Sequence, residues 1–217
     1  MHKSTLTILV FCLLTLNGFN QINAITEKGD TIFVYNNGTW KSKPTIKKPE
    51  SIKSSVEATV TIDDFSNKKS INTKNWTSFG ISTTKTKLTG FATYYNDGVY
   101  AVKLTLASDL GCMSNQRSTL KVKLSNDEVI EFIQVSKTDC SNSVFATFAP
   151  ITEADLKNEN YMDLIKENVD ILKQYDWVTI RIQGSEYYID ITPRITKKTP
   201  NPEQFFRQHF TSISNKL

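Results

Sequence analysis

Glycine, histidine and cysteine are scarce in this chain of 217 residues, which has eight glycines, two histidines and three cysteines. The glycines do not gather into a phosphate-binding loop, which argues against a site for a dinucleotide or a nucleoside triphosphate. The sequence also lacks Gly-x-Ser-x-Gly, His-Glu-x-x-His and Cys-x-x-Cys, short patterns of hydrolase, zinc and redox sites. We therefore expect no cofactor, no metal ion and no site that needs several histidines.

An excess of charge of one sign is also missing. The chain has 26 basic and 22 acidic side chains, so its formal net charge is +4. This excess is too mild to indicate a nucleic-acid partner, since nucleic-acid-binding domains carry concentrated positive charge. Apolar residues make up 39% and charged residues 22% of the chain, a mixture typical of a globular protein.

The N-terminus has the three-part plan of a secretory signal peptide. Lys3 supplies positive charge, an apolar segment covers residues 6–16, and Ala24 offers a small residue at a cleavage point. The apolar segment has 11 residues, whereas a helix that spans a bilayer needs roughly 20. We predict a signal peptide over residues 1–24 and an exported mature protein, periplasmic or secreted, with no membrane span.

Cleavage after Ala24 would leave two cysteines, Cys112 and Cys140, and an even count in an exported protein indicates a disulfide. Residues 120–124 and 129–135 predict two antiparallel strands joined by a turn. Pairing around that turn puts position i opposite about 254 − i, which brings the two cysteines within reach of each other. We predict a Cys112–Cys140 disulfide, with two free thiols or a catalytic cysteine as the alternatives.

Three segments follow the predicted signal peptide. Residues 25–40 predict a short β-hairpin module, because a stretch with strand pattern is followed by the turn signal Asn36-Asn37-Gly38. Residues 41–56 are rich in lysine, proline and serine, so we predict a solvated linker, with a basic patch for anionic polymers or lipid headgroups as the alternative. Residues 57–217 predict the main domain.

The main domain begins with short stretches of alternating apolar and polar residues, separated by turn signals. Strands are predicted at 58–63, 76–83, 89–95, 99–107, 120–124, 129–135, 144–148, 177–183 and 187–192. We expect the first of these to be half-buried. In the strand at 177–183 we expect Val178, Ile180 and Ile182 to face the core.

Helical periodicity appears twice in the second half of the chain. Thr152 and Asp155 have the spacing of a capping box, and apolar residues then recur at helical spacing, which predicts one or two helices over residues 152–174. A last helix is predicted after Pro202. The order of elements predicts an α+β domain that is mostly β, an antiparallel sheet or sandwich-like domain with one packed helix region and a C-terminal helix.

Two segments resemble known exported proteins. The segment EKGDTIFVYNNGTW, residues 27–40, resembles a motif near the mature N-terminus of many secreted Bacteroidota proteins, in which a strand precedes Asp/Asn-Gly-Thr-Trp. The stretch from Tyr100 to Ile213 is similar to exported Bacteroidota domains with a disulfide-bearing hairpin and an apolar-Arg-apolar strand, here Ile180-Arg181-Ile182. These resemblances imply export and lineage, and they imply no activity.

The remaining candidates are single polar side chains. Asp63 and Asp64 are neighbours in a strand, so they point to opposite faces and cannot act on one atom. His209 lies on the apolar stripe of the last helix and is interpreted as a partly buried packing residue. Asn37 and Asn75 lie in glycosylation sequons, which matter only if the source is eukaryotic.

Aromatic residues are the most suggestive feature. Exposed tyrosines on a sheet can stack on sugar rings or anchor a protein partner. Of Tyr94-Tyr95 and of Tyr187-Tyr188 we expect one member in the core and one at the surface, and we take Tyr95 and Tyr188 as a candidate binding surface. Cross-strand packing is the alternative. The three tryptophans, Trp40, Trp76 and Trp177, are expected in the core.

The sequence therefore predicts an exported, non-enzymatic protein that binds another macromolecule, a protein or a glycan, through the face or edge of its sheet. One alternative is a hydrolase whose acidic residues are brought together only by the fold. A second alternative is a glycan-binding module.

Overall fold

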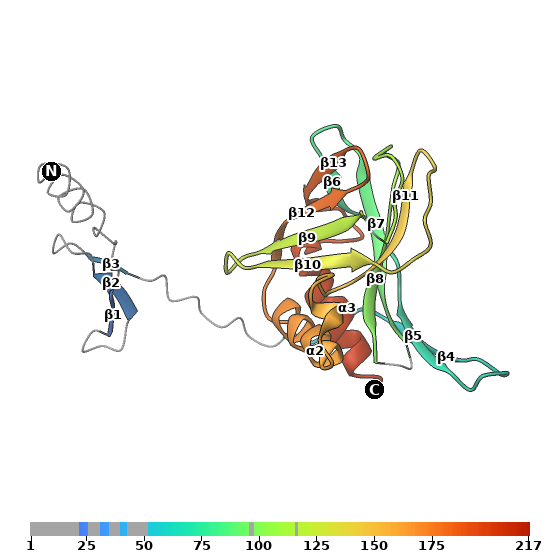
Figure 1. Cartoon of the computed structure of the whole chain (residues 1–217), viewed down its shortest axis with the longest axis horizontal. Helices are drawn as coiled ribbons and strands as arrows, with labels where there is room; N and C mark the ends of the chain where they lie inside the picture. Colours follow the sequence, from blue (N-terminus) through green and yellow to red (C-terminus); the bar gives the residue numbers. More distant parts are fainter. Residues whose placement is uncertain (1–21, 26–30, 35–39, 43–51, 96–97, 116) are drawn as a thin grey trace, which may run out of the picture. The chain divides into compact units, whose positions relative to one another are not determined.

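The structure is a computed structural model that describes residues 22–25, 31–34, 40–42, 52–95, 98–115 and 117–217. The predicted apolar segment of the signal peptide, the Asn36-Asn37-Gly38 turn and most of the predicted linker lie outside these residues. The chain divides into two compact units, Met1–Lys47 and Lys48–Leu217 (Figure 1).

The described part of the first unit is a small antiparallel sheet. Its strands are β1 (Ile22–Ile25), β2 (Thr31–Val34) and β3 (Trp40–Ser42), paired in the order β1-β2-β3. β2 and the first residue of β3 fall in the segment 25–40, for which a hairpin is predicted. β3 continues into the predicted linker, and β1 is an additional strand. Cleavage after Ala24 would remove all of β1 except Ile25, and it would leave β2 paired with β3.

The second unit contains one ten-stranded sheet in its described residues. The strands are β4 (Ala58–Ile62), β5 (Lys69–Thr73), β6 (Trp76–Ser82), β7 (Lys87–Tyr95), β8 (Tyr100–Leu106), β9 (Thr119–Leu124), β10 (Val129–Gln134), β11 (Val144–Ala149), β12 (Trp177–Gln183) and β13 (Tyr188–Pro193). All of their pairings are antiparallel.

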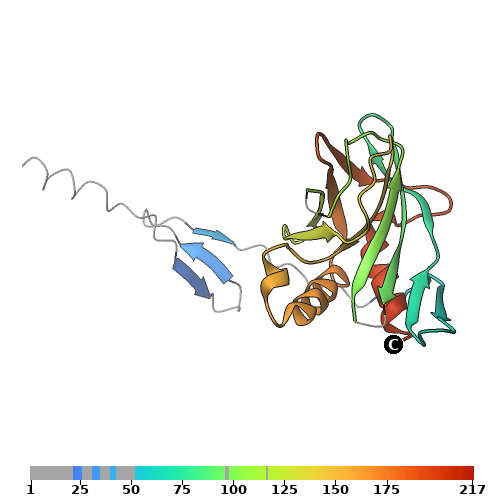
Figure 2. The same ribbon diagram turned by 45° about the vertical axis from the view of Figure 1, so that its right-hand side comes forward.

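Eight of these strands close into a barrel. Their order is β7-β6-β13-β12-β9-β10-β11-β8, and β8 pairs with β7 to complete the circuit (Figures 1 and 2). β5 pairs with β7 beyond the part of β7 that β6 occupies, and β4 pairs with β5 outside the barrel. The structure thus confirms the predicted α+β, mostly β class with its C-terminal helix. The sequence did not predict that the sheet closes into a barrel.

Side chains fill the interior of the barrel. Alternate residues of each strand point inward, so that Leu120, Val122 and Leu124 of β9 are fully buried while the lysines between them are exposed. These residues and their counterparts on the other strands form one continuous apolar cluster. The interior is therefore a packed core, as in other small barrels, rather than a ligand cavity.

The C-terminal helix contributes its aromatic face to this core. η2 (Pro202–Gln204) leads into α3 (Phe205–Ser214). The ring of Phe205 stacks on that of Phe79 from β6, with centroids 4.0 Å apart, and Phe206 contacts Phe132 from β10. Both views show α2 and α3 at the same end of the barrel (Figures 1 and 2). α3 thus covers that end.

The predicted helical region after Thr152 forms two short helices, η1 (Asp155–Lys157) and α2 (Tyr161–Leu172). Thr152 and Asp155 make the reciprocal contacts of a capping box. The Asp155 N–H donates to Thr152 Oγ1 at 3.2 Å, and the Thr152 N–H donates to the Asp155 carboxylate at 3.4 Å, while the Thr152 hydroxyl also donates to that carboxylate at 2.6 Å. The predicted start signal and the prediction of helices are confirmed.

A disulfide joins Cys112 to Cys140, as predicted. The register differs from the predicted one by two residues. Val129 pairs with Lys123 and Met113 pairs with Asp139, so position i faces 252 − i and Cys112 directly faces Cys140. The turn between the strands is shorter than expected because Asp127 adopts a positive φ of 68°.

Three details of the sheet differ from prediction. β4 is mostly exposed rather than half-buried, because it pairs only with β5 and lies outside the barrel. β5 was not predicted, since its polar sequence KSINT has no strand pattern. Val178 is 44% exposed, because a register shift between Trp177 and Thr179 turns it outward and leaves Trp177 in the core.

Candidate binding surfaces

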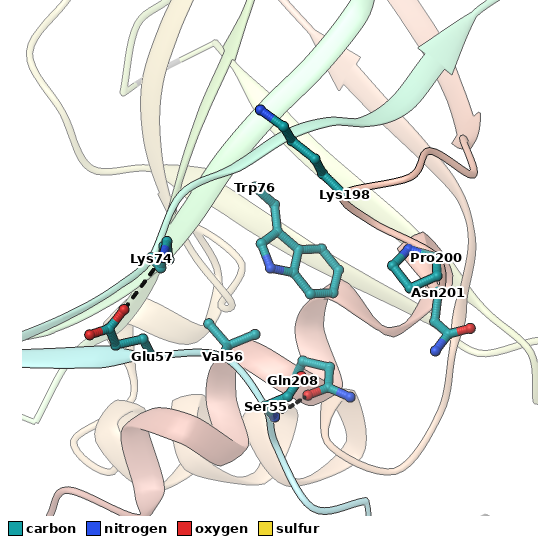
Figure 3. A pocket seen from close by; sticks show the side chains of 9 residues that line it. All are labelled: Ser55, Val56, Glu57, Lys74, Trp76, Lys198, Pro200, Asn201 and Gln208. Atoms are coloured by element: carbon teal, nitrogen blue, oxygen red, sulfur yellow. Dashed lines mark hydrogen bonds and ion pairs between the residues drawn. The ribbon is translucent and has the colours of Figure 1, made fainter.

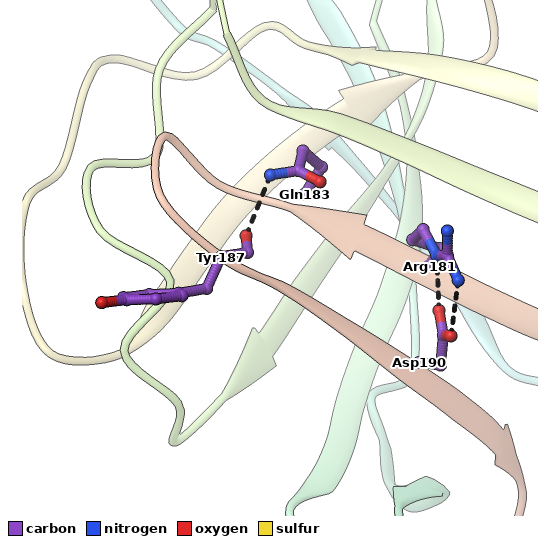
Figure 4. A network of polar contacts seen from close by, with 4 residues as sticks. All are labelled: Arg181, Gln183, Tyr187 and Asp190. Atoms are coloured by element: carbon purple, nitrogen blue, oxygen red, sulfur yellow. Dashed lines mark hydrogen bonds and ion pairs between the residues drawn. The ribbon is translucent and has the colours of Figure 1, made fainter.

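Tyr188 begins β13 and lies on the outer face of the barrel, 56% exposed. The guanidinium of Arg181, from β12, lies over its ring at 4.2 Å from the centroid. Arg181 in turn donates two hydrogen bonds of 2.7 Å to the two carboxylate oxygens of Asp190 (Figure 4). This fork holds the guanidinium in one plane, so the aromatic and charged groups are presented in a fixed geometry.

The Arg181–Asp190 contact also shifts the titration of both groups. Hydrogen bonding from Arg181 lowers the pKa of the Asp190 carboxyl, and the same bonds to Asp190 raise the pKa of the Arg181 guanidinium. Both groups therefore stay charged at neutral pH.

The fork is part of a charged row that crosses four adjacent strands. In register across β13, β12, β9 and β10, the row consists of Asp190, Arg181, Lys121 and Glu131. Lys121 forms an ion pair of 3.0 Å with Glu131. Two cations thus stand side by side at the centre of the row, with a carboxylate at each end.

Tyr187 and Tyr188 are both exposed, which contradicts the expectation that one of them is in the core. Tyr187 is 60% exposed and precedes β13, so strand alternation does not apply to it. Its carbonyl oxygen accepts a hydrogen bond of 3.1 Å from Gln183, while its ring extends away from the strand (Figure 4). Tyr188 is therefore the tyrosine that lies beside the charged row, and Tyr187 is exposed away from it (Figure 4).

Tyr95 ends β7 and is 41% exposed, while Tyr94 packs against the core with its ring 4.9 Å from that of Tyr100. The expectation for this pair is therefore met. Tyr95 pairs with Ser70 of β5 near the helical end of the barrel, whereas Tyr188 begins a strand that is separated from β7 by β6. The structure does not bring the two candidate tyrosines together.

A first hollow, of about 280 Å³, opens beside Trp76, which the sequence placed in the core. Its lining residues are Ser55, Val56, Glu57, Lys74, Trp76, Lys198, Pro200, Asn201 and Gln208. Figure 3 shows the indole at the centre, between the Lys74–Glu57 pair on one side and Pro200 and Asn201 on the other. Trp177 is in the core as expected, and the structure does not describe the side chain of Trp40.

The indole of Trp76 packs against two residues of α3. Its ring meets that of His209 edge-on at 4.9 Å and that of Phe205 at 5.8 Å. His209 is fully buried rather than partly buried, and burial lowers its pKa from an ordinary 6.5 to about 3. The imidazole is therefore neutral at physiological pH, and it serves as packing beneath the aromatic wall of the hollow.

A second hollow, also about 280 Å³, lies between the start of β6, the start of β7 and the loop after β13. Its lining residues are Thr77, Ser78, Lys87, Arg194, Thr196, Lys197 and Lys198. These residues were not among the candidates predicted from the sequence. Arg194, Lys197 and Lys198 follow a strand within five residues, which is a weak signal for a basic site, and Lys87 joins them only through the fold.

Within the described part of the chain, no three His, Cys, Asp or Glu side chains are grouped so that they could hold a metal ion. In the same residues, no helix is both long and apolar enough to cross a membrane. Comparison of the chain with protein-family models, with curated proteins and with solved structures gives no match. Functional inference therefore depends on the surfaces described above.

Proposed function

We propose that this chain is an exported, non-enzymatic protein that binds another protein, at the cell envelope or outside the cell, through the outer face of β13, β12, β9 and β10. The observation that carries the proposal is the stack of Tyr188 under a guanidinium that Asp190 holds in place. Tyrosine and arginine are the residue types that dominate binding energy in protein interfaces. Because this pair is already ordered, little side-chain entropy remains to be lost on binding.

The charge pattern indicates what the partner presents. Arg181 and Lys121 stand side by side at the centre of the charged row, between two carboxylates. A partner that places an acidic side chain over the two cations and an apolar or aromatic group over Tyr188 would be complementary to this surface. Export, the second half of the proposal, is supported by the sequence of residues 1–24 and by the Cys112–Cys140 disulfide.

Site-specific crosslinking tests the proposal. A photo-reactive amino acid replaces Tyr188 in the full chain, expressed in cells of the source organism, and the matched control carries it at the exposed Thr59 of β4. We expect one protein to crosslink at position 188 and not at 59. With that protein purified, Tyr188→Ala should weaken binding about tenfold or more. Equal crosslinking at both positions, or unchanged affinity, would refute the proposed surface.

A broad activity panel separates this proposal from the hydrolase alternative. The purified chain is tested against esters, glycosides and peptides, and each hit is repeated with single Asp→Asn and Glu→Gln variants. Turnover that one such change abolishes would overturn the non-enzymatic half of the proposal. The absence of turnover with all three substrate classes would support the non-enzymatic half of the proposal.

A further inference from the structure

The second hollow is lined by four cations and by no acidic side chain. Lys87, Arg194, Lys197 and Lys198 supply the positive charges, and Thr77, Ser78 and Thr196 supply hydroxyl groups. None of the ion pairs among the described residues includes any of the four cations. The hollow is therefore a local concentration of positive charge that no carboxylate among its lining residues compensates.

Backbone contacts fix the position of these cations. The Arg194 N–H donates to the carbonyl oxygen of Phe79 at 2.9 Å, which ties the loop to β6. Thr196 and Thr199 then exchange two backbone hydrogen bonds of 3.0 and 3.2 Å, and this tight turn places Lys197 and Lys198 at its tip. The buried Thr199 anchors the turn. The lysines therefore project from a well-supported loop.

β6 is distorted at the same place. Its pairing with β7 is interrupted between Trp76 and Gly80, and Ser78 has a positive φ of 57°. A non-glycine residue in this conformation costs free energy, and such bulges are common beside binding sites because they redirect side chains. Here the bulge directs Thr77 and Ser78 toward the hollow, while Phe79 stays in the core.

The guanidinium of Arg194 provides separate evidence that the hollow binds a ligand. Its Nη1 atom is buried and has no hydrogen-bond partner among the described residues. A buried guanidinium nitrogen without an acceptor is costly, and native proteins normally satisfy such groups with protein, water or ligand oxygens. Among ligand groups, a carboxylate or sulfate offers oxygens that match the guanidinium fork. The hollow thus has both the charge and an unsatisfied donor for an oxyanion.

The first hollow adjoins the second. Lys198 lines both of them, and Trp76 in the first is followed in sequence by Thr77 and Ser78 in the second. Around the indole stand the amides of Asn201 and Gln208 and the side chains of Ser55 and Lys74 (Figure 3). A flat aromatic face surrounded by polar groups suits a sugar ring, whose C–H groups stack on the indole while its hydroxyls bond to the rim.

We propose that the two hollows together bind an acidic saccharide, with a sugar ring on Trp76 and its carboxylate or sulfate group at Arg194 and Lys198. A lipid is disfavoured as the occupant because only Val56 and Pro200 add aliphatic surface to the rim. This site lies apart from the charged row that contains Arg181, and it does not depend on the proposed protein partner.

Titration calorimetry of the full chain tests the site with three probes. They are tetragalacturonate, a neutral glucose tetrasaccharide, and inorganic sulfate. We expect tetragalacturonate to bind, the neutral tetrasaccharide to bind at least about tenfold more weakly, and binding to weaken as salt is raised from about 0.05 M to about 0.3 M. Arg194→Gln should reduce affinity for tetragalacturonate about tenfold or more.

Matched controls make the result specific. Arg117→Gln removes one exposed arginine on another loop, so it changes the net charge equally and should leave affinity within about twofold. Asn201 is exposed, and its side chain makes no hydrogen bond within the described residues. Asn201→Ala should therefore lower the affinity for tetragalacturonate but leave the affinity for sulfate unchanged. The indole N–H signal of Trp76 should shift in NMR spectra when tetragalacturonate is added.

Three outcomes would overturn the proposal. Equal losses in Arg194→Gln and Arg117→Gln would show attraction by net charge alone. Sulfate that binds as tightly as tetragalacturonate, without a shift of the Trp76 signal, would show a free-anion site. Stronger binding to anionic phospholipid vesicles or to a phosphopeptide would assign the cations to another class of ligand. Because Tyr188→Ala should leave tetragalacturonate binding unchanged, failure here is distinguishable from failure of the proposed protein interface.

Discussion

Oγ1 of Thr73 lies 2.6 Å from Nδ1 of His209, and this contact joins β5 to α3 across 136 residues of sequence. The same hydroxyl donates to the Ala92 carbonyl at 3.0 Å and accepts from the Ala92 N–H at 2.8 Å. Because the hydroxyl hydrogen is used on Ala92, this network assigns the imidazole proton to Nδ1. All three residues are buried, so one hydroxyl group links the barrel, the outer hairpin and the C-terminal helix.

Replacement of Thr73 by valine should therefore lower the free energy of unfolding, although the two side chains have nearly the same size. Valine keeps the shape of threonine but leaves the Nδ1–H of His209 and the backbone groups of Ala92 without this partner in the core. We expect the free energy of unfolding, measured by urea denaturation, to fall by about 3 kcal/mol. Thr73→Ser keeps the hydroxyl and should lose about 1 kcal/mol. Equal losses in the two variants would contradict the role of the hydroxyl.

Buried His209 predicts a dependence of stability on pH. Burial lowers its pKa from 6.5 to about 3. Below pH 6.5 the unfolded chain therefore binds a proton that the folded chain does not bind. The free energy of unfolding should consequently be highest above pH 6.5 and should fall by up to about 1.4 kcal/mol per pH unit as the pH is lowered toward 3.

His209→Asn separates this effect from other titrations, because the asparagine amide can still bond to Thr73 but does not titrate. In urea melts between pH 7 and pH 4, this variant should show a smaller decline than the unmodified chain. The lowered pKa of Asp190 adds a loss of stability only below its ordinary value of 3.8. Parallel curves for the variant and the unmodified chain would rule out His209 as the source.

The disulfide should stabilise the second unit by restricting its unfolded state. Cys112 and Cys140 are 28 residues apart, and closing a loop of this length contributes about 3–4 kcal/mol in the chain-entropy model. Cys112→Ser should lower the melting temperature under oxidising conditions and change little when reductant is present. If reductant leaves the melting temperature of the unmodified chain unchanged, the disulfide does not contribute as expected.

The stack of Phe205 on Phe79 should be the most sensitive point of α3. Both rings are fully buried, with centroids 4.0 Å apart and planes within 2° of parallel. Phe205→Ala should lower the free energy of unfolding by about 3–5 kcal/mol, because it removes buried area and leaves a cavity. Phe65, which is 100% exposed, provides the matched control, and Phe65→Ala should change stability by less than about 0.5 kcal/mol. Similar losses in both variants would refute the assignment of α3 to the core.

Much of the local structure could be predicted because it depends on neighbouring residues. The capping box of Thr152 and Asp155 is satisfied within four residues, and its contacts form as the spacing indicates. The alternation in β9 follows from the two-residue period of a strand, so its buried and exposed positions could be predicted directly. The cysteine pair followed from the hairpin, although a two-residue error in the turn shifted the register.

The misplaced residues show where local pattern is not sufficient. Val178 and Trp177 were both expected inside, and only Trp177 lies there, because the bulge in β12 depends on its partner β9. β5 has no apolar pattern, and it exists because the free part of the edge of β7 offers hydrogen-bonding groups to pair with. Trp76 was expected in the core, and its partly buried position depends on α3, whose Phe205 and His209 meet its ring edge-on.

The sequence by itself determined the class of the fold, the order of most strands and helices, and the cysteine pair, because each depends on short-range periodicity, turn chemistry or residue count. Only the tertiary structure decided that the sheet closes on itself and which polar groups meet. Lys87 and Arg194 are 107 positions apart in the chain, yet they line one hollow because β7 and the end of β13 both pair with β6. Such meetings depend on strand order across the whole domain, which no local pattern specifies.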